Sequence, residues 1–194
     1  MGIIGPMPPL RWLLAISLLL LVLQAGHADV RSCQCDPARP ETMDARECSL
    51  CKVAEAQPAE SAYFLLKDSN PNKPNRWLAL PRSHGEKPQD LRTMTAAERA
   101  AYWTFAIAEA RKKFGEAWGL AINSIERRTQ CHVHIHVGRL CKEGVEEAIP
   151  AFDVVDGPAD IPYERVGDGL LVHPVAGKFH VHRGNDSPEL QLDR

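Results

Sequence analysis

The chain carries no excess of basic charge. It has 23 Lys and Arg residues against 25 Asp and Glu residues, a formal net charge of −2 over 194 residues. Proteins that bind nucleic acid in bulk usually present a basic patch, so this balance argues against a nucleic-acid partner. It also gives no support to electrostatic attraction toward an acidic membrane surface. No long repeat or low-complexity tract is present.

The N-terminal apolar run is too short to span a bilayer comfortably. It extends from Trp12 to Leu23, interrupted only by Ser17, whereas a membrane-spanning helix takes roughly 20 residues. Arg11 precedes the run and the small-residue stretch 25–28 follows it. These features predict a secretory signal peptide over residues 1–28 and an exported protein, periplasmic or extracellular. An uncleaved N-terminal membrane anchor is the alternative.

All six cysteines lie beyond this segment: Cys33, Cys35, Cys48, Cys51, Cys131 and Cys141. An even count in an exported chain favours disulfides. Zinc or redox chemistry at Cys48 and Cys51 is the alternative. A strand from Cys131 to Gly138 would span roughly 20 Å, but the Cα atoms of a disulfide lie within about 7 Å. Cys131 and Cys141 are therefore not expected to pair with each other, and each should bond toward the N-terminal cysteines.

The remaining pattern predicts an α+β fold, an antiparallel sheet with one main helix. Residues 29–47 read as a disulfide-stapled lead-in. Residues 61–68 and 76–80 read as an antiparallel hairpin. Thr95 and Glu98 form a capping box at the start of a helix that ends at Gly115. Residues 118–123 form a strand beside the histidine-rich segment that follows.

The C-terminal region, residues 146–194, is expected to be an extension with a small hairpin. Its strands are residues 169–173 and 178–183. This hairpin could bring His173 beside His180 and His182, which alternate in sequence. An exposed polar strand face is the expectation for these three residues, and adventitious metal binding is the functional alternative. They are not placed in the active site.

The segment "RRTQCHVHIHVGRLC" (127–141) carries the strongest functional signal. Because a strand has a side-chain period of two, His132, His134 and His136 share one face, and the intervening Val133, Ile135 and Val137 share the other. Two chemistries fit: zinc chelation by neutral imidazoles, or a histidine nucleophile acting on phosphorus. No Asp or Glu lies between Arg127 and Lys142, whereas a zinc hydrolase usually has a carboxylate base nearby. The flanking polar residues instead suit phosphate oxygens: Asn123, Ser124, Arg127, Arg128, Thr129 and Gln130.

"HVHIHVG" (132–138) resembles the signature of the histidine-triad superfamily, with Gly138 at a place that is usually apolar. "RWLALPRSHGEKPQDL" (76–91), with His84, is similar to that superfamily's second landmark, and Cys48-x-x-Cys51 is similar to the start of such domains. "LAINSIERRTQCHVHIH" (120–136) most resembles the CDP-diacylglycerol pyrophosphatase branch. That branch has a glycine-rich segment where this chain has "RSHGEKP" (82–88). The resemblance covers about Cys48 to Leu140, and a catalytic domain is expected over 48–145.

The resemblance implies a histidine-triad-like fold and a phosphohydrolase that needs no metal or other cofactor. His134 would attack the nucleotide α-phosphorus, while His132 and His136 orient it and hold phosphate oxygens. The other implied substrate contacts are His84, Asn123, Arg128, Thr129 and Gln130, although Arg128 also suits a solvated loop. The favoured substrate is CDP-diacylglycerol, a lipid met at a membrane surface, cleaved to CMP and phosphatidate.

Several alternatives remain open. A soluble dinucleotide or a phosphoramidate would suit the same chemistry. A secreted zinc-dependent hydrolase and a non-catalytic metal- or nucleotide-binding protein are hypotheses from other classes. Because many proteins of the superfamily are dimers, the resemblance also allows a homodimer.

Overall fold

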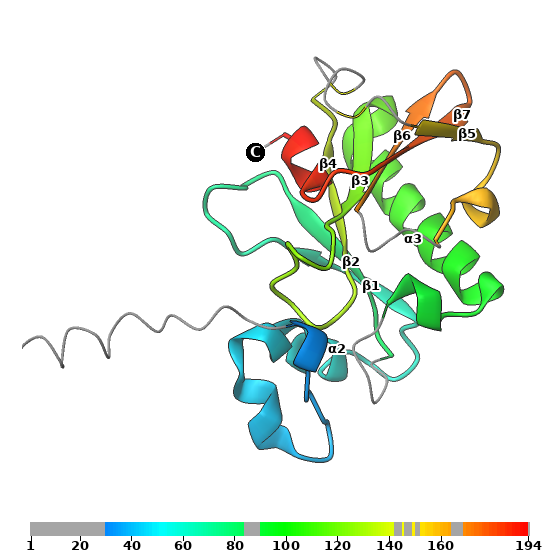
Figure 1. The fold of residues 1–194 in the computed structure, drawn as a ribbon. Coiled ribbons are helices and arrows are strands. Elements are labelled where there is room, and N and C mark those ends of the chain that lie inside the picture. Colours follow the sequence, from blue (N-terminus) through cyan, green and yellow to red (C-terminus); the bar gives the residue numbers. More distant parts are fainter. Residues whose placement is uncertain are drawn as a thin grey trace, which may run out of the picture.

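The computed structural model describes residues 30–83, 90–141, 145, 149, 152–163 and 169–193. The predicted signal peptide and His84 lie outside these residues. The described chain is α+β, as expected (Figure 1). Its helices are α2 (Ser49–Glu55) and α3 (Ala96–Phe114). Its strands are β1 (Tyr63–Lys67), β2 (Trp77–Pro81), β3 (Trp118–Ile122), β4 (Ile135–Arg139), β5 (Phe152–Val155), β6 (Leu170–Val175) and β7 (Lys178–Arg183).

The seven strands form one antiparallel sheet in the order β1-β2-β4-β3-β6-β7-β5. The predicted first hairpin is confirmed as β1 and β2, with Tyr63 opposite Pro81. The predicted antiparallel pairing of β3 with β4 is also confirmed, with Leu120 opposite Val137. The histidine-bearing strand β4 is therefore central, held between β2 and β3.

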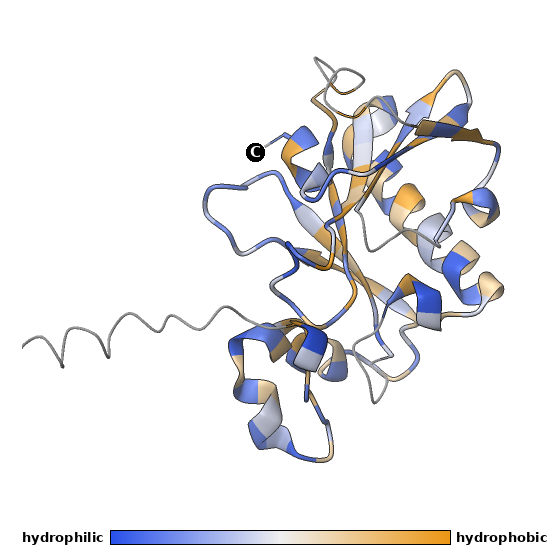
Figure 2. Cartoon of the chain, in the orientation of Figure 1, coloured by the Kyte–Doolittle hydropathy of each residue, from blue (hydrophilic) through white to orange (hydrophobic). Residues whose placement is uncertain are grey.

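The helix α3 covers one face of this sheet (Figure 1). The predicted capping box is present: the Thr95 side chain accepts from the Glu98 amide, and the Glu98 carboxylate accepts from the Thr95 amide. At the other end Gly115 has a φ of 56°, a conformation that glycine adopts without strain. The buried stripe of α3, which includes Trp103 and Ile107, packs on the apolar residues of the central strands. In Figure 2 the central strands carry orange, hydrophobic residues together with paler and blue ones.

The predicted C-terminal hairpin is confirmed as β6 and β7, and it continues the main sheet. Leu120 of β3 lies opposite Val172 of β6, and β5 completes the edge beyond β7. After β7 the chain returns to the face opposite α3 and forms the 3-10 turn η8 (Pro188–Gln191). Leu192 packs there in a second apolar cluster with Ala121, Leu140 and Leu171.

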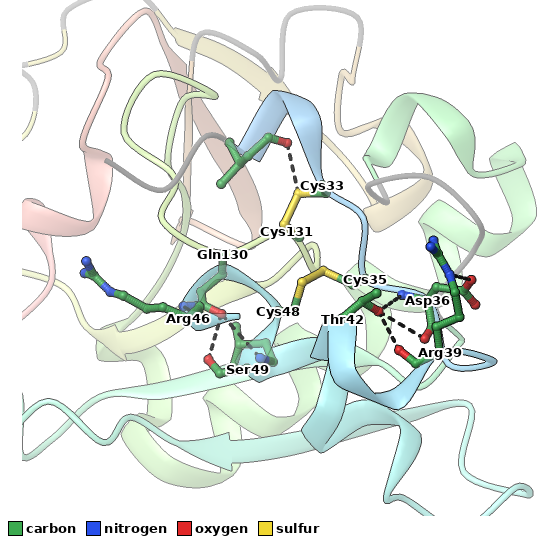
Figure 3. The surroundings of a disulfide bond; sticks show 12 residues. Cys33, Cys35, Asp36, Arg39, Thr42, Arg46, Cys48, Ser49, Gln130 and Cys131 are labelled. Atoms are coloured by element: carbon green, nitrogen blue, oxygen red, sulfur yellow. Dashed lines mark hydrogen bonds and ion pairs between the residues drawn. A yellow bond between two sulfur atoms is a disulfide. The ribbon is translucent and has the colours of Figure 1, made fainter. Parts of the chain in front are cut away.

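The N-terminal lead-in is tied to the sheet by disulfides (Figure 3). Cys33 bonds to Cys131, just before β4, and Cys35 bonds to Cys48 at the start of α2. This confirms that Cys131 pairs with an N-terminal cysteine and not with Cys141. The zinc alternative at Cys48 and Cys51 is wrong because Cys48 is bridged. The bridges are consistent with an oxidising, exported location.

Cys141 does not reach the lead-in, and that expectation was wrong. Its thiol is exposed and unpaired, and the expectation of a bridge at Cys51 was also wrong, since Cys51 is a free, buried cysteine that packs beside the bridged ones. Its backbone amide donates to the carbonyl of Gln191, near η8. The lead-in is bridged to Cys131, just before β4, whereas Cys141 follows the other end of β4.

In the part of the chain that the structure describes, no helix is long and apolar enough to cross a bilayer.

Candidate functional site

The first histidine group consists of His132, His134 and His136. The regular strand begins only at Ile135, later than the expected start at Cys131, yet the alternation of faces holds. Val133, Ile135 and Val137 belong to the core under α3, so the three imidazoles lie on the opposite face. All three are buried, with exposed fractions of 1%, 8% and 6% in chain order. The sequence-predicted cluster is thus brought together inside the protein.

His134 is held in a defined tautomer. Its Nδ1 lies 2.9 Å from the carbonyl oxygen of His132. A carbonyl oxygen only accepts, so Nδ1 carries the hydrogen and the neutral ring keeps a lone pair on Nε2. Burial, opposed by that hydrogen bond and assisted by the charge of Arg128, lowers the pKa of His134 to about 4. At neutral pH His134 is therefore an uncharged ring with an unprotonated Nε2.

The side chain of His132 helps to fix its own backbone carbonyl, which accepts the hydrogen bond from His134. Its Nε2 donates to the carbonyl oxygen of Pro81, the last residue of β2, at 2.8 Å. The preceding Cys131 is fixed by its disulfide and by a hydrogen bond from its amide to Glu47. The carbonyl that accepts from His134 is consequently anchored on both sides.

His136 lies between Asn123 and Glu189. Asn123 Nδ2 is 3.4 Å from Nε2 of His136, and Nδ1 of the same ring is 3.4 Å from Glu189 Oε2. These neighbours favour the tautomer with hydrogen on Nδ1. Burial and the adjacent His134 lower the pKa of His136 well below its usual value, although the Glu189 carboxylate opposes the shift. The ring of His136 meets that of His134 edge to face, with centroids 4.8 Å apart.

Glu189 is a site residue that sequence reasoning missed. It comes from η8, and its carboxylate lies 2.5 Å from Lys73 Nζ and 3.4 Å from Arg76 Nη1. Asn123 Nδ2 also donates to it, at 2.9 Å. Burial alone would raise the pKa of Glu189, but His136, Lys73 and Asn123 lower it to about 2. No local motif marks a lone glutamate in a C-terminal segment, so only the tertiary fold reveals it.

Arg76 holds that segment in place. It is only 1% exposed, and its guanidinium donates to the backbone carbonyls of Glu189, Leu192 and Asp193. Gly138 makes this approach feasible, because an added Cβ would lie 3.0 Å from Arg76 Cδ and 3.2 Å from Leu192 Cβ. A glycine at position 138, where the signature described above usually has an apolar residue, therefore has a structural reason in this chain.

Arg128 is buried, so the alternative of a solvated loop charge is wrong. It is 6% exposed, and burial lowers its pKa while the Asp90 carboxylate opposes that effect. Although burial would raise the pKa of Asp90, hydrogen bonds from Arg92 and the charge of Arg128 lower it. Among the described residues, Arg128 Nη2 has no hydrogen-bond partner.

Two more polar atoms near the end of β3 are buried without a hydrogen-bond partner in the described part of the chain. They are Asn123 Oδ1 and Ser124 Oγ. Buried polar atoms are normally paired, and each exception needs an explanation such as an absent ligand. Of these residues, Asn123 lies beside the first histidine group, with its Nδ2 3.4 Å from His136 Nε2.

Gln130 and Thr129 do not join this arrangement. The Gln130 amide accepts from Ser49 Oγ and the Leu50 amide, and it donates to the carbonyl of Arg46 (Figure 3). Thr129 is exposed. Of the expected substrate contacts, the structure brings Asn123 next to His136 and Arg128 within electrostatic reach of His134.

The second histidine group, His173, His180 and His182, is not an exposed polar face. His173 and His182 are 6% and 1% exposed, so that expectation was wrong. The side chains lie on the face opposite α3, where His182 Nδ1 meets the carbonyl of Ile149 and the Phe152 ring packs on His180 and His182, contacts that the hairpin sequence alone does not reveal.

No protein-family model matches the chain, and a search of curated proteins finds none that is significantly similar.

Proposed function

We propose that this protein is an exported phosphohydrolase that cleaves a nucleotide-linked pyrophosphate through a covalent intermediate on His134. The favoured substrate is CDP-diacylglycerol, and the products are CMP and phosphatidate. A soluble dinucleotide or a nucleoside phosphoramidate would use the same chemistry. The resemblance of residues 48–140 to the histidine-triad superfamily supports the proposal at the level of sequence motifs.

One observation carries the proposal. The His132 carbonyl takes the Nδ1 hydrogen of His134, and burial keeps the ring neutral at neutral pH. A nucleophilic histidine needs both conditions, because only an unprotonated nitrogen can attack phosphorus.

The reaction would proceed in two displacements. In the first, His134 Nε2 attacks the α-phosphorus, a P–N bond forms, and the bond from that phosphorus to the bridging oxygen breaks with its electron pair leaving on phosphatidate. In the second, a water oxygen attacks the same phosphorus and the P–N bond breaks. CMP leaves, and the protons of the water pass to solvent or to the released phosphates. His134 returns to its neutral form.

The surrounding residues suit the charge that develops on phosphate oxygens. Phosphoryl transfer depends mainly on positioning and on electrostatic stabilisation. Arg128 Nη2 and Ser124 Oγ are buried donors without a partner in the described chain, and either could donate to phosphate. His136, held between Asn123 and Glu189, would orient the phosphate that His134 attacks.

A zinc-dependent hydrolase at the same residues is less well supported. Among the described clusters, the first histidine group does not bring three ligand nitrogens within 4.8 Å of one another. Chelation at the first histidine group would need its rings to move until three of their nitrogens converge.

The test is a product assay combined with adduct trapping. The purified protein, with its disulfides formed, would be assayed against CDP-diacylglycerol in mixed micelles, a dinucleoside polyphosphate and a nucleoside phosphoramidate. Rapid quench and mass spectrometry should find a nucleotidyl group on His134. His134→Asn should abolish turnover and the adduct while leaving the fold intact.

The neighbouring histidines provide matched controls. His132→Asn and His136→Asn should slow turnover on the order of 10²–10³-fold, the usual effect of losing one stabilising donor, yet still form the adduct. An adduct on another histidine would contradict the assignment of His134. Complete inactivation by a chelator, with recovery on added zinc, would favour the hydrolase of the other class.

A further inference from the structure

The second histidine group converges on one point. His173 on β6 lies directly opposite His180 on β7, and His182 is two residues further along the same strand face. One ring nitrogen from each histidine lies within 4.8 Å of the other two. The closest pair, His173 Nε2 and His182 Nε2, is 2.9 Å apart. Three imidazoles from adjacent strands thus meet in a space the size of one coordination sphere.

His182 is oriented as a metal ligand would be. Its Nδ1 lies 2.7 Å from the carbonyl oxygen of Ile149. Because a carbonyl accepts, Nδ1 carries the hydrogen and Nε2 presents its lone pair to His173. A ligating histidine almost always donates its other nitrogen to a carbonyl, a carboxylate or water, which fixes its tautomer and ring orientation.

The surroundings form a largely apolar shell. The Phe152 ring stacks on His180 with centroids 4.6 Å apart and lies 5.1 Å from the ring of His182. Leu171, on the same face, is fully buried. His180 is half-buried, so the cluster is open to solvent on that side and an ion could enter there.

A hydrogen bond between His173 and His182, without a metal ion, explains less of this arrangement than a bound ion does. The 2.9 Å contact is satisfied if His173 Nε2 donates to His182 Nε2, but that bond leaves His180 without a role. His180 Nδ1 is buried with no hydrogen-bond partner among the described residues. We propose that His173, His180 and His182 bind one divalent transition-metal ion, with Zn²⁺ as the best match for a set of neutral imidazoles.

Binding requires a small rearrangement and the loss of one hydrogen. Zinc–nitrogen bonds of about 2.0–2.1 Å in a tetrahedron place ligand nitrogens roughly 3.3 Å apart. His173 and His182 must therefore separate by a few tenths of an ångström. The hydrogen between them leaves to solvent or moves to the other nitrogen of His173, so that both Nε2 lone pairs face the ion. Water would take the fourth position.

This site is separate from the first histidine group. Residues that lie opposite one another across the sheet form a row from His136 through Ala121 and Leu171 to His182. Three strand spacings of about 4.8 Å put the two groups roughly 14 Å apart. Ala121 and Leu171 belong to the apolar cluster between them. The ion would not reach His134, so its role is to fasten β6 and β7, and the proposal does not depend on the proposed function.

The experiment measures Zn²⁺ binding by the full chain, produced without a polyhistidine tag and stripped of metal. Competition against a chromophoric chelator gives the affinity, and elemental analysis gives the stoichiometry. The wild type should bind one equivalent, and bound zinc should slow amide exchange in β6 and β7. His180→Asn should weaken binding at least about 100-fold, the upper end of the cost of losing an outer-shell partner.

His180 is chosen because its partial exposure makes the variant tolerable to the fold, which circular dichroism would verify. His173→Asn gives a second, independent ligand loss. His134→Asn serves as the matched control and should bind zinc like the wild type. The proposal is overturned if the wild type binds no stoichiometric zinc, or if folded His180→Asn and His173→Asn bind it unchanged. Loss of zinc in His134→Asn with retention in His180→Asn would move the ion to the first group and equally overturn it.

Discussion

Glu189 Oε2 lies 3.4 Å from His136 Nδ1, so a residue of the C-terminal segment completes the surroundings of the first histidine group. The same carboxylate accepts from Asn123 and Lys73. A single side chain thereby connects the ends of β2 and β3 with the histidine strand. Under the proposed function Glu189 would act as a positioning residue, because it lies beside His136 and accepts from Asn123.

Replacing Glu189 should separate kcat from KM. Glu189→Gln removes the charge that orients His136, so kcat should fall on the order of 10-fold to 100-fold, as when other orienting partners are lost. KM should not rise, because the carboxylate does not attract an anionic substrate. Steady-state kinetics would test this, with exposed Glu126→Gln as the control. A rise in KM with unchanged kcat would contradict a positioning role.

The pH dependence should reflect the burial of His134. The nucleophile must be neutral, and burial lowers its pKa to about 4. The acidic limb of kcat/KM should therefore fall near pH 4, well below the value of about 6.5 for an exposed histidine. Activity is lost as pH falls through that limb, because the ring becomes protonated. The substrate should not titrate in this range. An acidic limb of kcat/KM at pH 6.5 or above would contradict the lowered pKa of His134 and show that its ring is exposed to water in solution.

Arg128 should contribute to substrate binding. Arg128→Met keeps comparable bulk but removes one charge beside the buried Asp90, which is destabilising, so the fold of the variant is checked by circular dichroism first. The loss of a charged donor to phosphate should raise KM on the order of 10-fold or more, since hydrogen bonds to charged groups contribute about 1.5–3 kcal/mol. The neighbouring Arg127, which is exposed, provides the control Arg127→Met. Equal kinetics for the two variants would assign Arg128 a purely structural part.

Gly138 should not tolerate a side chain. In Gly138→Val the new carbons would press on Arg76 and Leu192, displacing the segment that carries Glu189. Overpacking of this kind typically costs about 1–3 kcal/mol of unfolding free energy, and kcat should fall as in the Glu189 variant. Chemical denaturation and kinetics would measure both. Gly157→Val is the control, because its nearest contact would be an ordinary 3.5 Å.

The long disulfide should contribute strongly to stability. Cys33 and Cys131 are 98 residues apart in sequence, and bridges in small secreted domains contribute about 2–5 kcal/mol. The double variant Cys33→Ser, Cys131→Ser should lower the urea midpoint accordingly, whereas Cys141→Ser should not. Peptide mapping without reductant should recover the two pairs Cys33–Cys131 and Cys35–Cys48. Any other pairing would contradict the structure.

Features with a local physical cause were predictable from the sequence. The capping box at Thr95, the strand alternation around Ile135 and the hairpin of β1 and β2 depend on short stretches of chain. The absence of a Cys131–Cys141 bridge was predictable for the same reason, because the length of the strand separates those two residues. The placement of the three histidines opposite the α3 core also followed from periodicity.

Features that depend on long-range docking were not predictable. The sequence does not reveal that Arg76 binds the backbone near Leu192, and so it does not reveal Glu189. The contact of His182 with the carbonyl of Ile149, 33 residues earlier, is likewise not visible in the sequence. Gln130 is polar and adjacent to the histidines in sequence, but its side-chain amide bonds to Ser49 of α2. Residue type alone does not predict which of these partners the amide takes.

The nested disulfides also bear on biosynthesis. Cys33 is synthesised 98 residues before its partner, and in that interval Cys35, Cys48 and Cys51 are the thiols beside it. Pairing in order of appearance would give the wrong bridges, so production in an oxidising compartment should benefit from a disulfide isomerase. Once the chain has folded, burial raises the pKa of Cys51 to about 12. Because only a thiolate attacks a disulfide, the one spare thiol near the native bridges is then unable to scramble them.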